Sequence, residues 1–88
     1  MLMRGKMWLR IKYLFSMQEH NLDIQDKYFQ DVKSGIKTFE IRQRNRNYNV
    51  GDAIILKNLD NNEVLIKKIK YICDASIYNQ PNIIILGI

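Results

Sequence analysis

Residues 34–42, SGIKTFEIR, decide the fold of this chain because they join two segments with different periodicities. Upstream, the sequence predicts a short helix that begins with Asp26 as its N-cap and ends at Ser34. Gly35 then stands where a helix commonly ends in a left-handed residue, a conformation that glycine adopts at little cost. The stretch therefore predicts one helix over residues 26–34 that leads directly into a strand.

Downstream of the glycine, TFEIR alternates apolar and polar residues with the period of a strand. The alternation predicts that Phe39 and Ile41 point into the core. It places Thr38, Glu40 and Arg42 on the side that faces solvent. On such a face Glu40 and Arg42 would form a surface ion pair that contributes about 0–1 kcal/mol.

The remaining sequence predicts further short strands separated by polar turns. We expect strands at residues 20–24, 53–57, 64–72 and 83–88, and loops at residues 43–49 and 74–82. The third strand would contain a bulge at Lys67–Lys68, and the last, IIILGI, would be buried on both faces. The sequence thus predicts a mostly β (α+β) fold in which one helix and about five to six strands form a small, strongly curved sheet or barrel.

A chain of 88 residues has room for one domain. We place that domain at residues 19–88 and treat residues 1–18 as an N-terminal extension. Within the extension, residues 8–15 fit a strand and a helix equally well. The sequence contains no apolar run that is long enough for a signal peptide or a membrane span.

The composition excludes several kinds of site. One cysteine and one histidine cannot form an internal disulfide or a Cys/His zinc site, and no metal or cofactor is expected. We expect Cys73 to be a buried structural thiol in a reduced, cytoplasmic setting. The net charge is +5, and residues 33–57 hold six basic residues against two acidic ones. Such a surface attracts polyanions, nucleic acid first, although many basic surfaces bind nothing.

Several segments together resemble a known family. HNLDI, KYF, SGIKTFEIR, NYNVGD and IIILGI resemble the ASCH domain of the PUA-like superfamily, and more closely a small bacterial and phage ASCH-related family of unknown function. The resemblance runs from His20 to Ile88. It implies a PUA-like pseudobarrel whose helix leads into the motif strand, and it implies RNA binding.

The resemblance and the basic loop after the motif imply a cleft that binds RNA or another nucleic acid. In that cleft Lys37 would contact phosphate, while Glu40 would orient the guanidinium of Arg42 toward phosphate or a base edge. Gly35 would let a ligand approach the backbone closely. The other candidate contacts are Arg44 and Arg46 in the loop, Tyr48 as a stacking ring and His20 as a donor.

Each candidate also has a structural alternative. Lys37 could be an ordinary solvated lysine, and Tyr48 could pack beneath the loop. A lone histidine such as His20 is more often structural than functional, and Asp52 in VGD is typical of a turn. Asn45 and Asn47 stand where the related family often has acidic residues, a difference that favours polyanion binding.

Two other functions remain open. Some bacterial ASCH proteins remove an acyl group from a modified nucleoside with a lysine in this motif, a threonine three residues later and a later glutamate. Lys37 matches that lysine, but Glu40 replaces the threonine, and Glu63 is the only later glutamate. The sequence therefore favours a non-catalytic domain over a small amidohydrolase. The third alternative is a protein-interaction accessory module that docks through residues 1–18.

Overall fold

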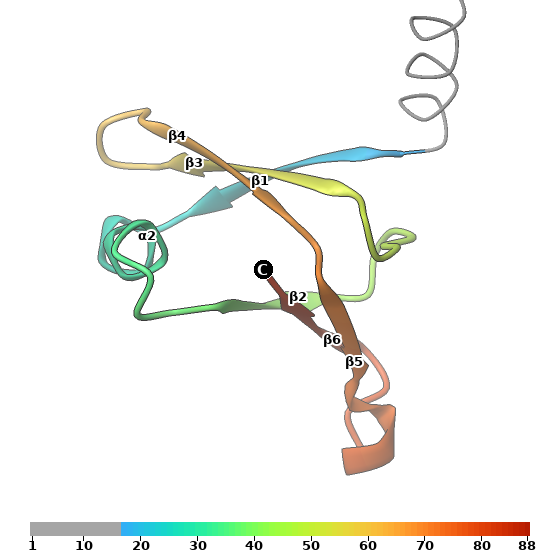
Figure 1. Cartoon of the computed structure of the whole chain (residues 1–88). Coiled ribbons are helices and arrows are strands. Elements are labelled where there is room, and N and C mark those ends of the chain that lie inside the picture. The colour runs from blue at the N-terminus through green and yellow to red at the C-terminus, as the bar shows by residue number, and fades with distance from the viewer. Residues whose placement is uncertain (1–16) are drawn as a thin grey trace, which may run out of the picture.

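The computed structural model describes residues 17–88, so the alternatives for residues 8–15 lie outside the described part of the chain. In chain order the elements are β1 (Glu19–Ile24), α2 (Asp26–Lys33), β2 (Phe39–Gln43), β3 (Ala53–Asn58), β4 (Val64–Lys68), β5 (Tyr71–Asp74), the 3-10 helix η1 (Ala75–Tyr78) and β6 (Ile83–Gly87). The strands form two three-stranded sheets, ordered β1-β3-β4 and β2-β6-β5. Figure 1 shows the two sheets facing each other, with α2 at one side. This mostly β, α+β architecture confirms the predicted small pseudobarrel-like domain.

The hydrophobic core lies between the two sheets. Strand β1 runs parallel to β3 and therefore requires a crossover, which α2, β2 and the loop after β2 supply. The other strand pairs are antiparallel. Side chains that alternate along the strands point inward and meet those of α2. The core residues are Leu22, Ile24, Phe29, Val32, Tyr48, Ile54, Leu56, Ile69, Ile84, Leu86 and Ile88.

The barrel has one continuous corner and one open side. At the corner, the chain passes directly from β4 in the first sheet to β5 in the second. At the other end of each strand order lie β1 and β2, which are the edge strands of their sheets. We call the gap between β1 and β2 the seam.

Strand β2 has the predicted alternation but the opposite orientation. Phe39 and Ile41 are 42% and 56% exposed, whereas Glu40 is 3% exposed. Their predicted positions in the core and in solvent were therefore wrong. Glu40 lies opposite Leu86 in the β2–β6 pair, and Leu86 points into the core. The shared register places the carboxylate on the inner face of the sheet.

The predicted long strand over residues 64–72 was also wrong, because it is two strands in different sheets. The chain turns at Ile69, which is fully buried. The Ile69 N–H donates to the carbonyl of Asp52, while the Lys70 N–H donates to the carbonyl of Gly87 in the second sheet. What looked like a bulge at Lys67–Lys68 is the approach to this corner.

The last strand is not buried on both faces as predicted. In β6, Ile84 and Leu86 are buried, whereas the residues that alternate with them are only partly buried. Cys73 lies opposite Ile85 on the partly covered outer face, so its thiol is less buried than expected. The β2-β6-β5 sheet therefore covers the core with one face and leaves the other open.

Helix α2 ends as predicted but begins differently. Its N-cap is Gln25, and Asp26 is the first helical residue. The Asp26 carboxylate accepts hydrogen bonds from Asn58 on β3 and from Gln30, and no side-chain hydrogen bond caps the helix. At the other end, Gly35 has a φ of +85°, which confirms its predicted role in ending the helix.

Candidate functional site

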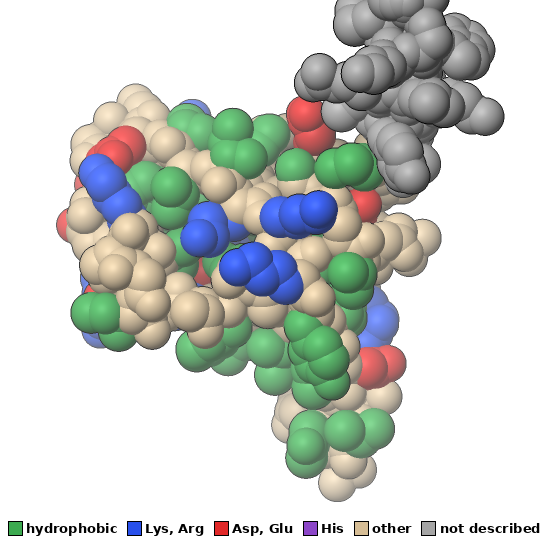
Figure 2. Space-filling model, viewed as in Figure 1, with side chains coloured by type: hydrophobic (Ala, Val, Ile, Leu, Met, Phe, Trp, Pro, Cys, Tyr) green, Lys and Arg blue, Asp and Glu red, His purple; other side chains and the backbone are tan. Residues whose placement is uncertain are grey.

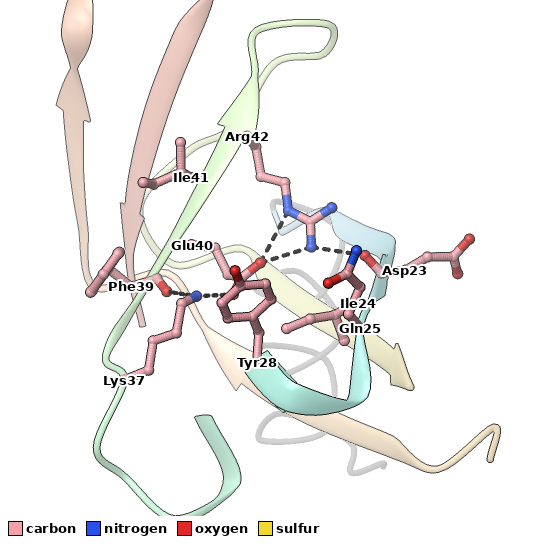
Figure 3. Close-up of a pocket in the computed structure, with 9 residues that line it drawn as sticks. All are labelled: Asp23, Ile24, Gln25, Tyr28, Lys37, Phe39, Glu40, Ile41 and Arg42. Atoms are coloured by element: carbon pink, nitrogen blue, oxygen red, sulfur yellow. Dashed lines mark hydrogen bonds and ion pairs between the residues drawn. The ribbon is translucent and has the colours of Figure 1, made fainter. Parts of the chain in front are cut away.

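A pocket of about 500 Å³ opens at the seam. Its lining comes from β1, the start of α2 and the motif strand β2: Asp23, Ile24, Gln25, Tyr28, Lys37, Phe39, Glu40, Ile41 and Arg42. Figure 3 shows the side chains of Lys37, Glu40 and Arg42 converging, while Phe39 and Ile41 leave the opposite side of β2. The three charged residues of the motif therefore share one concave site.

Glu40 is the centre of this charged cluster. Its Oε2 accepts a hydrogen bond from Lys37 Nζ at 2.5 Å, and its Oε1 accepts two from Arg42, from Nε at 3.1 Å and from Nη2 at 2.7 Å. The Glu40 side chain is 4% exposed, against 17% for Lys37 and 22% for Arg42. A carboxylate can be buried at tolerable cost only when it is paired and hydrogen-bonded, and here both oxygens are.

Arg42 also bridges the strand edges at the seam, whereas the hydrogen bonds of Lys37 go to Phe39 and Glu40, both on β2. Arg42 Nη2 donates to the carbonyl of Asp23 on β1 at 3.0 Å, and Lys37 Nζ donates to the carbonyl of Phe39 at 2.6 Å. These bonds use three of the five N–H groups of Arg42 and two of the three of Lys37. Among the described residues, the Nη1 group of Arg42 donates to no partner.

Two aromatic rings flank the charged cluster. Lys37 Nζ lies 4.8 Å from the centre of the Phe39 ring and 5.8 Å from that of Tyr28. Tyr28 is 41% exposed and offers an aromatic face at the pocket. Sequence reasoning did not select Tyr28 or Gln25, because only the packing of α2 beside β2 brings them to the motif. The pattern KYF contributed to the family resemblance but gave no signal that Tyr28 would lie beside the motif.

A second hollow of about 460 Å³ continues from the first toward the basic loop. The two hollows share Asp23, Ile41 and Arg42, so Arg42 stands between them. Of the two loop arginines, Arg46 lines the second hollow. Together the hollows form a groove along the seam.

The other loop arginine, Arg44, is engaged elsewhere. Its Nη2 lies 2.5 Å from the Asp74 carboxylate, and its Nε donates to the carbonyl of Pro81 at 3.2 Å. The pKa of Asp74 is lowered, first by hydrogen bonds from Ser76 and then by the charge of Arg44. Arg44 lines neither hollow, so the structure separates it from the other candidates.

His20 and Tyr48 support the loop from inside the barrel. They are 3% and 6% exposed, and their rings lie 4.6 Å apart at an angle of 44°. His20 Nε2 is 2.9 Å from Asp52 Oδ2. Burial raises the pKa of Asp52, but hydrogen bonds from His20 and from the N–H groups of Gln18 and Asn49 outweigh it and hold the pKa below its usual value. These contacts favour the structural alternative for His20, whereas Tyr48 is buried beside it and also lines the second hollow.

The remaining candidates lie outside the groove. Gly35 lines neither hollow. Thr38 is exposed, and the Glu63 carboxylate accepts a hydrogen bond from Lys33 at 2.6 Å, so neither joins Lys37 at the pocket. Within residues 17–88, no group of three His, Cys, Asp or Glu side chains is arranged to hold a metal ion. In the same part of the chain, no helix has the length and hydropathy needed to cross a bilayer.

In comparisons with known proteins, the matching part of the chain coincides with the strands and helices described above. Residues 19–88 match the family described as Domain of unknown function (DUF3850). The chain belongs to this family. The match begins at the first residue of β1 and includes every described strand, the groove and all candidate residues. None of the curated proteins compared with the chain gives a significant match.

Proposed function

We propose that this DUF3850 domain binds single-stranded RNA or a related nucleic acid along the seam, without catalysis. The observation that carries the proposal is the state of Arg42. Glu40 and the Asp23 carbonyl fix three of its N–H groups, Nη1 has no partner among the described residues, and the side chain lines both hollows. A guanidinium fixed in this way is suited to phosphate or to the acceptor edge of a base, because little side-chain entropy is lost on binding.

The surrounding groups suit a nucleotide. The partly exposed ring of Tyr28 offers a face on which a base can stack. Lys37 keeps one N–H for a phosphate oxygen, and Arg46 extends positive charge along the second hollow. Glu40 neutralises one of its two cations, so this triad has a net charge of only +1. We therefore expect binding at the seam to depend on stacking and directed hydrogen bonds more than on charge.

The resemblance of the motif to ASCH domains supports the same function. The pseudobarrel-like arrangement and the position of SGIKTFEIR after the helix are those that the resemblance implies. We propose a PUA-like relationship and a cytoplasmic role on this basis. Fold analogy alone is weak support for function, so the proposal rests on the groove.

The test uses tyrosines that can be removed without opening the core. Tyr28→Ala removes the ring at the pocket, and Tyr78→Ala removes a ring on η1 that is 67% exposed and lines neither hollow. Binding of a fluorescein-labelled 12-nucleotide single-stranded RNA is followed by anisotropy, with thermal unfolding as a check on folding. We expect Tyr28→Ala to weaken binding at least about five-fold and Tyr78→Ala to leave it unchanged.

A further variant separates geometry from charge. Arg42→Lys keeps the positive charge but removes the planar fork, so we expect weaker RNA binding at unchanged net charge. The proposal is wrong if the wild-type protein binds no RNA at low salt. It is also wrong if Tyr28→Ala and Tyr78→Ala bind equally well.

A further inference from the structure

Three lysines gather where the chain passes from one sheet to the other. Lys67 and Lys68 end β4, and Lys70 precedes β5. Figure 2 shows Lys and Arg side chains grouped on the face across which β4 continues into β5 in Figure 1. We call Lys67, Lys68 and Lys70 the corner lysines.

The corner lysines differ from the cations of the motif because they form no ion pair within residues 17–88, although the register places Glu19 of β1 opposite Ala53, the β3 partner of Lys68. Lys37 and Arg42 share Glu40, and Arg44 is paired with Asp74. Within residues 17–88, no ion pair or side-chain hydrogen bond involves a corner lysine. Strands β3 and β6, which flank the corner, contain no acidic residue. The ammonium groups of the corner lysines are therefore unpaired within the described residues and can contact a partner.

The corner also holds its lysines on a fixed backbone. Ile69, between them, is fully buried, and its N–H and carbonyl are bonded to Asp52 and Gly51. The Lys70 N–H is bonded to Gly87. Lys68 and Lys70 are exposed and Lys67 is half-buried, and we call the three charges at this turn a short basic track.

An exposed aromatic ring adjoins this track. Tyr71, the first residue of β5, is 68% exposed and lies opposite Gly87 in the β5–β6 pair. Strand β4 is an edge strand, and lysines on an edge strand often have no role other than to prevent aggregation. An exposed aromatic ring beside the lysines does not serve that purpose. Basic side chains interleaved with an aromatic ring are the pattern by which proteins hold single-stranded nucleic acid.

We propose that the corner lysines and Tyr71 form a second contact surface for single-stranded nucleic acid. The lysines contact phosphates without reading the sequence, and Tyr71 stacks a base. This inference rests on the proposed RNA binding at the seam and extends it. Strands β1 and β2 lie at one end of each strand order and β4 and β5 at the other, so the two surfaces lie on different sides of the barrel. Only a strand of several nucleotides can reach both.

The test compares two charge-matched double variants of the full chain. Lys68→Gln with Lys70→Gln removes two exposed charges at the corner. Lys33→Gln with Lys57→Gln removes two exposed charges elsewhere. Anisotropy titrations with the 12-nucleotide RNA are repeated across a KCl series. The slope of log K against log salt is negative. We expect its magnitude to decrease by about 1.4 for the corner variant, which is about 0.7 for each lost phosphate contact, and to change little for the control.

Two further measurements separate this inference from the seam proposal. Tyr71→Ala should weaken binding of the 12-nucleotide RNA at least about five-fold. The corner variant should bind a uridine dinucleotide as tightly as the wild type, because that probe occupies only the seam. If the corner and control variants lose the same slope while RNA still binds, the corner surface is refuted and the seam survives. If the wild type binds no RNA, the proposed function itself fails.

Discussion

Replacing Glu40 by glutamine tests whether the motif carboxylate is buried and paired or lies on a solvated face. Glutamine has nearly the same shape, so the change removes the charge without opening a cavity. In the structure the carboxylate accepts three hydrogen bonds from two cations and is 4% exposed. An amide offers only one acceptor oxygen, and its NH₂ group then faces a lysine or an arginine.

The magnitude follows from the burial of the three side chains. Removing one partner of a buried ion pair costs about 3–5 kcal/mol, because the other charge is left without compensation. Lys37 and Arg42 remain 17% and 22% exposed and can recover some hydration. We therefore expect Glu40→Gln to lower the free energy of unfolding by about 2–4 kcal/mol. If the Glu40 carboxylate lay on the solvated face, as predicted from the sequence, the substitution would lower the free energy of unfolding by only about 0–1 kcal/mol.

The assay is urea unfolding at pH 7, followed by circular dichroism. With an m value near 1 kcal/mol/M, the expected loss lowers the midpoint by about 2 M or more. Glu63→Gln is the matched control, because it removes the same charge from an ion pair whose side chains are 51% and 37% exposed. We expect that control to change stability by less than about 1 kcal/mol. Equal effects of the two substitutions would refute the burial of Glu40.

Four other substitutions test the fold. Phe29→Ala should cost about 3–5 kcal/mol, whereas Ile41→Ala, at a side chain that is 56% exposed, should cost less than about 1 kcal/mol; both are read from urea midpoints. Asn58→Ala should cost about 2 kcal/mol in the same assay, because this fully buried amide bonds the Asp26 carboxylate and the Asp60 N–H. The lowered pKa of Asp52 means that its contribution is present above the unfolded pKa of about 3.9 and is lost as pH falls through the folded pKa. The stability difference between wild type and Asp52→Asn should therefore shrink below about pH 4, and a difference independent of pH would contradict this linkage.

The sequence predicted the elements better than it predicted which way their side chains face. Alternation in TFEIR established a strand, but it cannot say which set of side chains faces inward. We chose the apolar set, although the outer face of the β2-β6-β5 sheet is itself apolar, with Phe39 and Tyr71 exposed on it. A signal for the correct choice was present, because basic residues stand on both sides of Glu40, at positions 37 and 42. Compensation of this kind is what allows a carboxylate to be buried.

The corner after β4 and the role of Tyr28 were harder to predict. The alternation slips at KKIK, which fits a bulge within one strand as well as a turn into a second sheet. Only the hydrogen bonds of Ile69 and Lys70 to different sheets decide between them. Tyr28 becomes part of the groove through the packing of α2 beside β2, a contact between segments that local patterns do not encode.

The distribution of charge changes what the net charge of +5 implies. Residues 1–16 contain four basic residues and no acidic ones, so residues 17–88 have ten basic against nine acidic residues, a net charge of +1. Within the motif, Glu40 offsets one of the two cations that it holds. A basic cleft around the motif, as the sequence suggested, would bind through charge and weaken steeply with salt. The structure instead puts a fixed guanidinium and an aromatic ring at the seam and leaves the corner lysines uncompensated elsewhere. If RNA binds, Arg42 and Tyr28 should therefore determine its affinity for the seam, and the corner lysines should determine its salt dependence. Substitutions at one set should change one property without the other.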